Sequence, residues 1–241
     1  MLLTWTPEPD LTVARAARLC YSPGGEAQVA EGMAQDEVCR LVARLWEAGH
    51  LSPFEHASFQ FYVEGSRAML AQLTRHRIAS YSVQSLRYVT PDRPCYVLPP
   101  AFRKDPALRE IYRSEMARAF GVYRRLLDEG APPEDARMVL GQGVATRLVA
   151  TFNARSLHNF FRLRCCRRAQ WEIRRIAYDM LREVKRVAPA LFERAGSPCE
   201  SEGRCPEGAL SCGRYRHLRR VPAGRGRRGP DPGHSDGDRL E

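Results

Sequence analysis

Long apolar runs are missing from this sequence of 241 residues. No stretch approaches the roughly 20 apolar residues that a membrane helix needs. The opening residues, MLLTWTPEPD, carry acids and prolines where a secretory signal would be basic and apolar. We therefore expect a cytoplasmic protein. With 44% hydrophobic content, the chain is long enough for one well-buried domain and too short for two large ones.

The familiar nucleotide and metal motifs are also missing. There is no GxxxxGK phosphate loop, no HExxH zinc helix and no internal repeat. Gly224, Gly226 and Gly229 match the GxGxxG spacing, but no predicted strand precedes them and no helix follows, so we reject a dinucleotide site there. The formal charge of +10 nevertheless favours an anionic partner, which can be a nucleotide, a polyphosphate cofactor or nucleic acid.

Cysteine, in contrast, is abundant. Three cysteines cluster late, at Cys199, Cys205 and Cys212, with gaps wider than the close pairs of common zinc sites and with no obvious fourth ligand. These three cysteines can belong to a local loop, a disulfide or a structural metal site. Because their spacing does not favour a metal, we predict no metal site. The other five stand in segments typical of a packed core, where a reducing compartment leaves them as free thiols: Cys20, Cys39, Cys95, Cys165 and Cys166.

The periodicity of apolar residues predicts one body of about 195 residues followed by an extension and a tail. Alternation in ASFQFYVE predicts a strand over residues 56–64 with Phe59, Phe61 and Val63 on one face, and a short strand is expected at 95–98. Gly49 should end the second helix, and Ser156 is a plausible N-cap. Helices are expected over residues 11–17, 36–48, 66–75, 108–129 (apolar stripe Ile111, Met116, Phe120, Tyr123, Leu127), 134–140, from 156 onward, and 169–187.

The segments after the body differ in composition. Residues 196–212 form a cysteine-containing extension, and residues 213–241 are rich in Arg, Gly and Pro with almost no large apolar side chains. Such a composition does not offset the entropy lost on ordering, so we expect the tail to be flexible.

Side chains suited to ligand binding concentrate in TRHRIASYSVQSLRY, residues 74–88. Arg75, His76 and Arg77 are consecutive and would fan out over about 200° of a helix, so the triplet suits a helix end or a turn. An ordinary basic helix terminus is the simpler interpretation of RHR alone. The donors that follow favour phosphate and a uracil ring instead: Ser80, Ser82, Gln84, Ser85 and Arg87.

Two further stretches carry polar groups among apolar ones. In TFNARSLHNFFRLRCCRRAQWEIR, helical spacing places Arg155, Asn159 and Arg162 on one face, which is either a solvated surface or the lining of a planar ligand. GHLSPFEHASF, from Gly49 to Phe59, is mostly explained by a structural turn, and its two histidines are weak evidence for metal.

Taken together, these motifs resemble the flavin-dependent thymidylate synthases. RHR followed after seven residues by Ser85 resembles that family's signature, and GHLSPFEH, NARSL and AQWEIR occur in the family's order over about residues 11–195. The resemblance implies an α+β homotetramer, each chain a single domain with a central antiparallel sheet flanked by helices, with active sites at subunit interfaces. It also implies reductive methylation of dUMP to dTMP with FAD as cofactor, methylenetetrahydrofolate as carbon donor and NADPH as reductant.

The resemblance also implies residue roles. Arg164 is the catalytic candidate, because a guanidinium at the uracil edge stabilises negative charge as hydride arrives. Ser85 is expected to be a positioned donor rather than a nucleophile, and neither Cys165 nor Cys166 is expected to attack the ring. The residues implied for FAD are Cys20, His50, Ser52, Arg75, His76, Arg77, Asn153, Arg155 and Asn159. Those implied for dUMP are Gln72, Arg75, Gln84, Ser85, Arg87, Arg137 and Arg164.

Ser82-Val83 departs from the family, many members of which carry Asn-Glu there. The lost carboxylate removes an acceptor and a negative charge that would contact nucleotide and flavin. A competing hypothesis is a nucleic-acid binder or flavin-dependent RNA-methylating enzyme, motivated by the +10 charge and the arginines of the tail. The body has no RNA-recognition signature. A zinc-stabilised interaction module built on the late cysteines is a third hypothesis, and it would leave the body unexplained.

Overall fold

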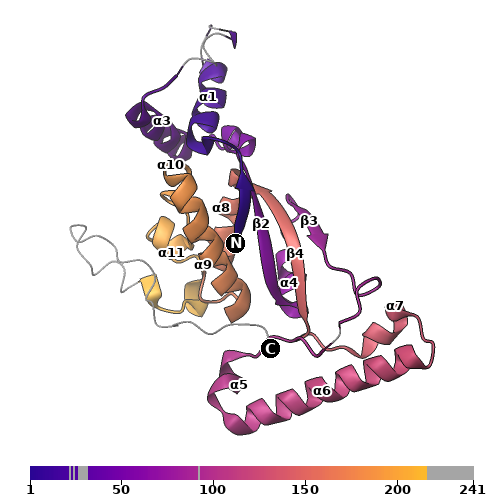
Figure 1. Cartoon of the computed structure of the whole chain (residues 1–241). Coiled ribbons are helices and arrows are strands. Elements are labelled where there is room, and N and C mark those ends of the chain that lie inside the picture. The colour runs from indigo at the N-terminus through magenta and orange to yellow at the C-terminus, as the bar shows by residue number, and fades with distance from the viewer. Residues whose placement is uncertain (22, 24, 27–31, 92, 216–241) are drawn as a thin grey trace. The chain divides into compact units, whose positions relative to one another are not determined.

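The computed structural model describes residues 1–21, 23, 25–26, 32–91 and 93–215. Its four strands, β1 (Leu2–Trp5), β2 (Ser58–Ser66), β3 (Ser80–Val83) and β4 (Ala145–Asn153), form one sheet in the order β1-β2-β4-β3 (Figure 1). β1 pairs antiparallel with β2, with Leu2 opposite Phe61. The predicted α+β class with an antiparallel sheet is confirmed.

Strand β2 follows its alternating sequence. Phe59, Phe61 and Val63 are buried, as predicted, while the side chains between them are less so. β3 and β4 were not predicted, and the strand expected at residues 95–98 is a single bridge between Tyr96 and Val144.

The chain clusters into two compact units whose boundaries fall within β2, β3 and β4 and between Arg75 and His76. Among the described residues, the first unit comprises Met1–Val63, His76–Tyr81 and the chain from Val149 onward. The second comprises Glu64–Arg75 and Ser82–Leu148.

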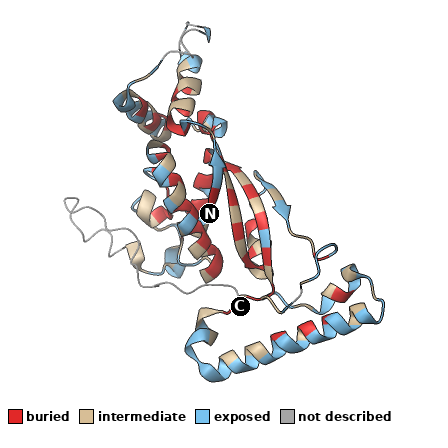
Figure 2. Ribbon diagram, viewed as in Figure 1, coloured by how far each residue is buried: buried red, intermediate tan, exposed pale blue. Residues whose placement is uncertain are grey.

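Helices of the first unit bury an aromatic core. Phe54, Phe160, Phe161 and Phe192 are fully buried, and His158 packs against Phe54 and Phe192. Figure 2 shows the alternation of buried (red) and less buried positions along strands β2 and β4. Gly49 adopts the left-handed conformation (φ 73°) that ends α3, as predicted. The helical elements are α1 (Pro9–Tyr21), α3 (Gln35–Ala48), η1 (Ser52–His56), α8 (Ala154–Arg164), α9 (Trp171–Val187), α10 (Pro189–Phe192), α11 (Pro198–Ser201) and η3 (Gly208–Leu210).

The N-cap of α8 is Asn153, so the prediction of Ser156 is wrong. The Asn153 side-chain oxygen accepts a hydrogen bond from the Ser156 backbone N–H at 2.8 Å. An Asn at this position satisfies one of the otherwise unpaired N–H groups of the first turn.

The second unit is built on the long helix α6. Met116, Phe120 and Tyr123 form its buried stripe, as expected, but Ile111 is 63% exposed and does not belong to it. The helix predicted over residues 134–140 is split into α7 and a 3-10 turn. The helical elements are α4 (Arg67–Leu73), α5 (Pro100–Lys104), α6 (Pro106–Asp128), α7 (Pro133–Ala136) and η2 (Arg137–Val139).

None of the described helices combines the length and the apolar character that crossing a membrane would require. At the far end of the described chain, Arg214 pairs with Glu200 at 2.6 Å and donates to the Tyr178 hydroxyl at 2.8 Å. Residues 216–241, which hold most of the Arg/Gly-rich tail and the GxGxxG-like glycines, lie outside the described residues.

Candidate active site

The RHR triplet lies in the turn between α4 and β3. Arg75 is the last residue of a segment of the second unit, and His76 and Arg77 belong to the first unit. Helix α4 ends at Leu73 and β3 begins at Ser80, which confirms that the triplet lies at a helix end. His76 is buried, whereas Arg75 and Arg77 are exposed. The triplet therefore points one imidazole inward and two guanidinium groups toward solvent.

His76 meets Arg164 inside the first unit. Arg164 Nε donates a hydrogen bond to His76 Nε2 at 3.0 Å, and the edge of Phe160 packs on the imidazole with ring centroids 4.9 Å apart. The Tyr81 hydroxyl donates to the His76 carbonyl at 2.8 Å. Burial, and then the nearby Arg164 charge, lowers the pKa of His76 to about 4. The imidazole is therefore neutral at pH 7, with its proton on Nδ1.

A cleft of about 400 Å³ in the first unit gathers four of the residues implied for FAD, namely Cys20, His50, Ser52 and Arg155. Tyr21 also lines it, and its hydroxyl lies 2.6 Å from His50 Nδ1 with the two rings nearly parallel. Sequence reasoning missed Tyr21, although an aromatic next to Cys20 at a helix end was a usable signal.

Two other residues implied for FAD lie on or beside α8. Asn159 is exposed together with Arg155 and Arg162, which confirms the predicted polar face of this helix. The Asn153 side-chain oxygen is engaged in capping α8. The neighbouring Arg155 forms an ion pair with Glu55 of η1, which fixes its guanidinium beside the cleft.

In the second unit, Glu134 contacts two residues implied for dUMP, and a third, Ser85, contacts one of these two. Arg87 Nε pairs with the Glu134 carboxylate at 2.8 Å, and Arg137 Nε donates to the Glu134 carbonyl at 3.2 Å. The Ser85 hydroxyl oxygen accepts the Arg87 backbone N–H at 3.2 Å. Sequence reasoning missed Glu134; its place one turn before Arg137 was the available signal.

Two further dUMP candidates of the second unit, Gln72 and Gln84, make backbone contacts. Gln72 Nε2 donates to the Ala68 carbonyl one turn earlier at 3.3 Å. The Gln84 backbone N–H donates to the Arg147 carbonyl of β4 at 2.9 Å, which continues the pairing of β3. Arg147 itself pairs across strands with Glu64 at 2.7 Å.

The cysteines beside Arg164 are poor nucleophiles. Burial raises the pKa of the Cys165 thiol, and burial also raises the pKa of Cys166. A higher pKa lowers the fraction of thiolate, which is the nucleophilic form of cysteine. This supports the expectation that neither cysteine carries the chemistry.

The first unit holds a guanidinium hydrogen-bonded to a neutral imidazole, and each unit taken by itself presents an arginine held by a carboxylate, Arg155 in the first and Arg87 in the second. Such groups are suited to binding anions, in a protein of the α+β class. The chain belongs to the thymidylate synthase complementing protein family, whose model matches residues 1–190. Cys199, Cys205 and Cys212 lie beyond that match.

Curated relatives agree with the family match. A flavin-dependent thymidylate synthase of Clostridium tetani is 44% identical over 91% of this chain and 95% of its own length. One of Geobacter sulfurreducens is 47% identical over 91% of this chain and 96% of its own. A third, of Nitratidesulfovibrio vulgaris, is 43% identical over 89% of this chain and 94% of its own. The resemblance of the sequence motifs to flavin-dependent thymidylate synthases is therefore confirmed.

Proposed function

We propose that this chain converts dUMP to dTMP by FAD-dependent reductive methylation, with methylenetetrahydrofolate as carbon donor and NADPH as reductant. The hydrogen bond between Arg164 and His76 is the observation that carries the proposal. It joins the RHR turn to the NARSL helix, two segments that together hold seven of the fifteen implied ligand-binding residues. Family membership supports the same activity.

The cleft of the first unit suits part of a flavin dinucleotide. Its volume of about 400 Å³ falls within the range of small-molecule sites, and His50, Ser52, Tyr21 and Arg155 offer donors around it. Cys20 completes the cofactor residues on this cleft. When bound, a flavin reduced by NADPH supplies the hydride that makes the transferred carbon a methyl group.

The cluster around Glu134 suits the nucleotide phosphate. Arg87 is held by the Glu134 carboxylate and Arg137 by the Glu134 backbone carbonyl, and a phosphate offers a guanidinium a charge-assisted, bidentate partner. Glu134 thus holds Arg87 in an anion-binding orientation until a nucleotide replaces the carboxylate. Gln72, Gln84 and Ser85 supply further polar groups for dUMP.

Arg164 is the proposed catalytic residue. Its guanidinium is permanently charged and partly buried, and Nε is committed to the neutral His76, so the group is oriented before substrate arrives. A preorganised cation stabilises negative charge developing on the uracil ring without further reorganisation. His76 acts on the reaction by holding that guanidinium.

We also propose a cytoplasmic homotetramer whose sites combine residues of more than one chain. Mixing two inactive variants tests the shared site: Arg155→Ala and Arg164→Ala subunits, reassembled together, should recover part of the activity. Recovery fails if each chain carries a complete site of its own.

One assay tests the activity itself. Purified protein, dUMP, methylenetetrahydrofolate and NADPH are mixed without air, and dTMP is measured by chromatography. We expect product that depends on each component and on bound FAD. Bound, reducible FAD without dTMP would overturn the proposal, and methylation of added RNA in the same mixture would favour the competing activity.

A further inference from the structure

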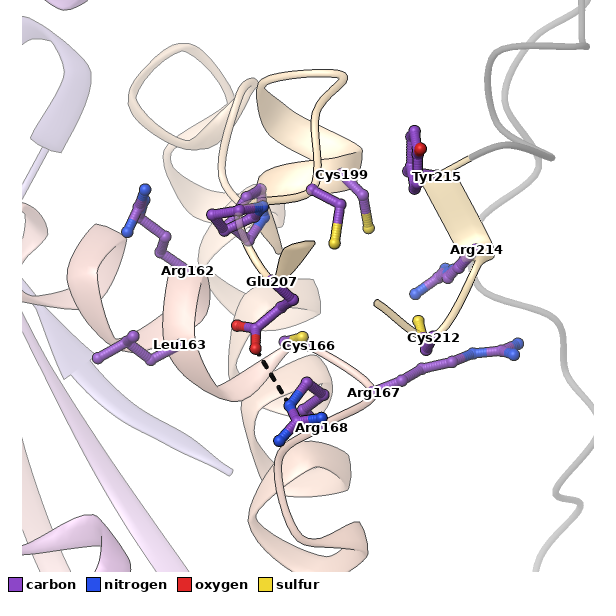
Figure 3. A pocket seen from close by; sticks show the side chains of 13 residues that line it. Arg162, Leu163, Cys166, Arg167, Arg168, Cys199, Glu207, Cys212, Arg214 and Tyr215 are labelled. Atoms are coloured by element: carbon purple, nitrogen blue, oxygen red, sulfur yellow. Dashed lines mark ion pairs between the residues drawn. The ribbon is translucent and has the colours of Figure 1, made fainter. Parts of the chain in front are cut away.

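The fold places Cys166 at the same cavity as the three late cysteines. Cys166, Cys199, Cys205 and Cys212 line a single cavity of about 90 Å³ in the first unit. Figure 3 shows the sulfurs of Cys166, Cys199 and Cys212 directed toward the same space. Cys166 lies 33 positions before Cys199 in the chain, so only the fold brings it to the others. All eight cysteines of the chain are free thiols.

We propose that these four cysteines form a structural zinc site. Four thiolates are the ligand set of closed tetrahedral zinc sites, in which each Zn–S distance is about 2.3 Å. Binding converts four thiols to thiolates and releases four protons to solvent, with no change of oxidation state. As the side chains stand, the described residues contain no ready-made group of three or more metal ligands. Zinc binding would therefore require the cysteine side chains to change rotamer about Cα–Cβ.

The charge of the cavity favours this complex. Zinc with four thiolates carries a net charge of 2−, because four negative charges meet two positive ones. Arginines dominate the charged lining, and Glu207 is the lining carboxylate, paired with Arg168 at 3.1 Å. The arginines are Arg162, Arg167, Arg168 and Arg214. Three of these guanidinium groups are paired with carboxylates, Arg162 with Glu202, Arg168 with Glu207 and Arg214 with Glu200, so they offset the excess negative charge of metal-bound thiolates in part.

The segment that carries three of the ligands has almost no core of its own. From Cys199 to Tyr215 no residue is buried, and Leu210 is 62% exposed. Polar contacts attach this segment to the body, as in Arg162 to Glu202 at 3.0 Å and Arg168 to the Leu210 carbonyl at 3.1 Å. Exposed ion pairs contribute little to stability. A metal is a common way to hold such a loop-rich segment.

A metal at this site would also hold the C-terminal end of α8 in place. Cys165 is the C-cap of α8, Cys166 follows it, and Arg164 is the last residue of the helix. An ion that ties Cys166 to Cys199, Cys205 and Cys212 therefore fastens the residue after the helix to the C-terminal segment. We assign it a positioning role and no contact with substrate.

Metal analysis of the whole chain tests the proposal. The protein is produced with added zinc and an affinity tag free of histidine, and its metals are measured by mass spectrometry. We expect about one zinc per chain. Cys166→Ser and Cys212→Ser should each lose most of it, while Cys39→Ser, a change of an exposed cysteine outside the cavity, should keep it.

Two measurements on the wild-type protein test the site even if the cysteine variants do not fold. Protein loaded with cobalt instead of zinc should show the intense visible bands of tetrahedral thiolate coordination, and a mercurial reagent should release the metal as these thiols react. A wild-type chain without zinc, or zinc retained by both ligand variants, would overturn the site. So would iron with acid-labile sulfide, or disulfides among the four cysteines.

Discussion

Arg164 Nε lies 3.0 Å from Nε2 of His76, a residue 88 positions earlier in the chain. Arginine keeps its protons, so it must be the donor and His76 must be a neutral acceptor. Burial and the Arg164 charge keep the imidazole neutral by lowering its pKa to about 4. The pair therefore holds one geometry across the neutral pH range, and it links the two motifs on which the proposed activity depends.

Replacing Arg164 should affect turnover far more than cofactor binding. We expect Arg164→Ala to lower kcat about 10²- to 10³-fold, the loss typical of one preorganised charge-stabilising group. FAD content, measured by absorbance, should stay near wild type. Arg182→Ala removes an exposed arginine of α9 and serves as the control. Equal activity of Arg164→Ala and Arg182→Ala would remove Arg164 from the catalytic role.

His158 should make the protein less stable in acid. It is buried against Trp46 and Phe192, and its Nε2 lies 2.8 Å from the Leu191 carbonyl. Burial, with a smaller contribution from the Lys185 charge, lowers its pKa from 6.5 to about 4, although the hydrogen bond to Leu191 opposes the shift. The unfolded chain thus binds a proton first as pH falls, and stability is lost between about pH 6.5 and 4.

Urea unfolding at several pH values measures this effect. The free energy of unfolding of the wild type should fall by up to about 1.4 kcal/mol more per pH unit than that of His158→Gln across this window. His56→Gln, a change on the exposed side of η1, provides the baseline. Parallel profiles for wild type and His158→Gln would show that His158 is not kept neutral by the fold.

Asp10 should stabilise the junction between α1 and α10. Its carboxylate accepts the backbone N–H groups of Leu191 at 2.9 Å and Ala190 at 3.1 Å, and the side chain is buried. Asp10→Ala leaves these donors unpaired, so we expect a loss of about 1–3 kcal/mol in the free energy of unfolding. Asp10→Asn keeps one acceptor and should lose less. Asp128→Ala, at an exposed helix end, is the control, and a loss no larger than the control's would contradict this role.

Local sequence patterns predicted those elements in which the buried residues match the spacing of the apolar residues or a glycine marks the end of a helix. The alternation of β2, the glycine stop of α3 and the amphipathic α9 are examples. β4 was missed because Thr146 and Ala150 occupy two of its buried positions, which weakens the period-two signal. β3 was missed because its four residues include no strongly apolar alternation.

The residues of the candidate site were also predictable only in part. Motif resemblance pointed to His50, Ser52 and Arg155, and the fold brings them to one cleft. Tertiary partners such as Glu134 were not predictable in the same way, because contacts between separate segments leave no local periodicity. Cys166 and the late cysteines are a further case, since their spacing alone gave three ligands and no fourth.

Replacing Arg87 should weaken nucleotide binding and leave flavin binding unchanged. It lies in the second unit, where Glu134 holds it at 2.8 Å. We expect Arg87→Ala to raise the Kd for dUMP by about 10- to 100-fold, because a charge-assisted hydrogen bond contributes about 1.5–3 kcal/mol. Calorimetry with dUMP measures the change, and flavin absorbance should not move. Arg124→Ala, on the exposed side of α6, is the control, and equal affinities of the two variants would exclude Arg87 from the phosphate site.

Val83 should be a position where nucleotide affinity can be gained. It is 37% exposed at the end of β3, next to Gln84, whose backbone pairs with β4. The resemblance to the family implies that many members have a carboxylate at this position that contacts nucleotide and flavin, so we propose that Val83→Glu supplies such an acceptor on a strand paired with β4. We expect it to lower the Kd for dUMP about tenfold, or about 1.4 kcal/mol. Val83→Gln supplies an amide of the same size without the charge and should give a smaller gain. If the Glu variant binds dUMP more weakly than the wild type, another group of this chain already replaces the carboxylate.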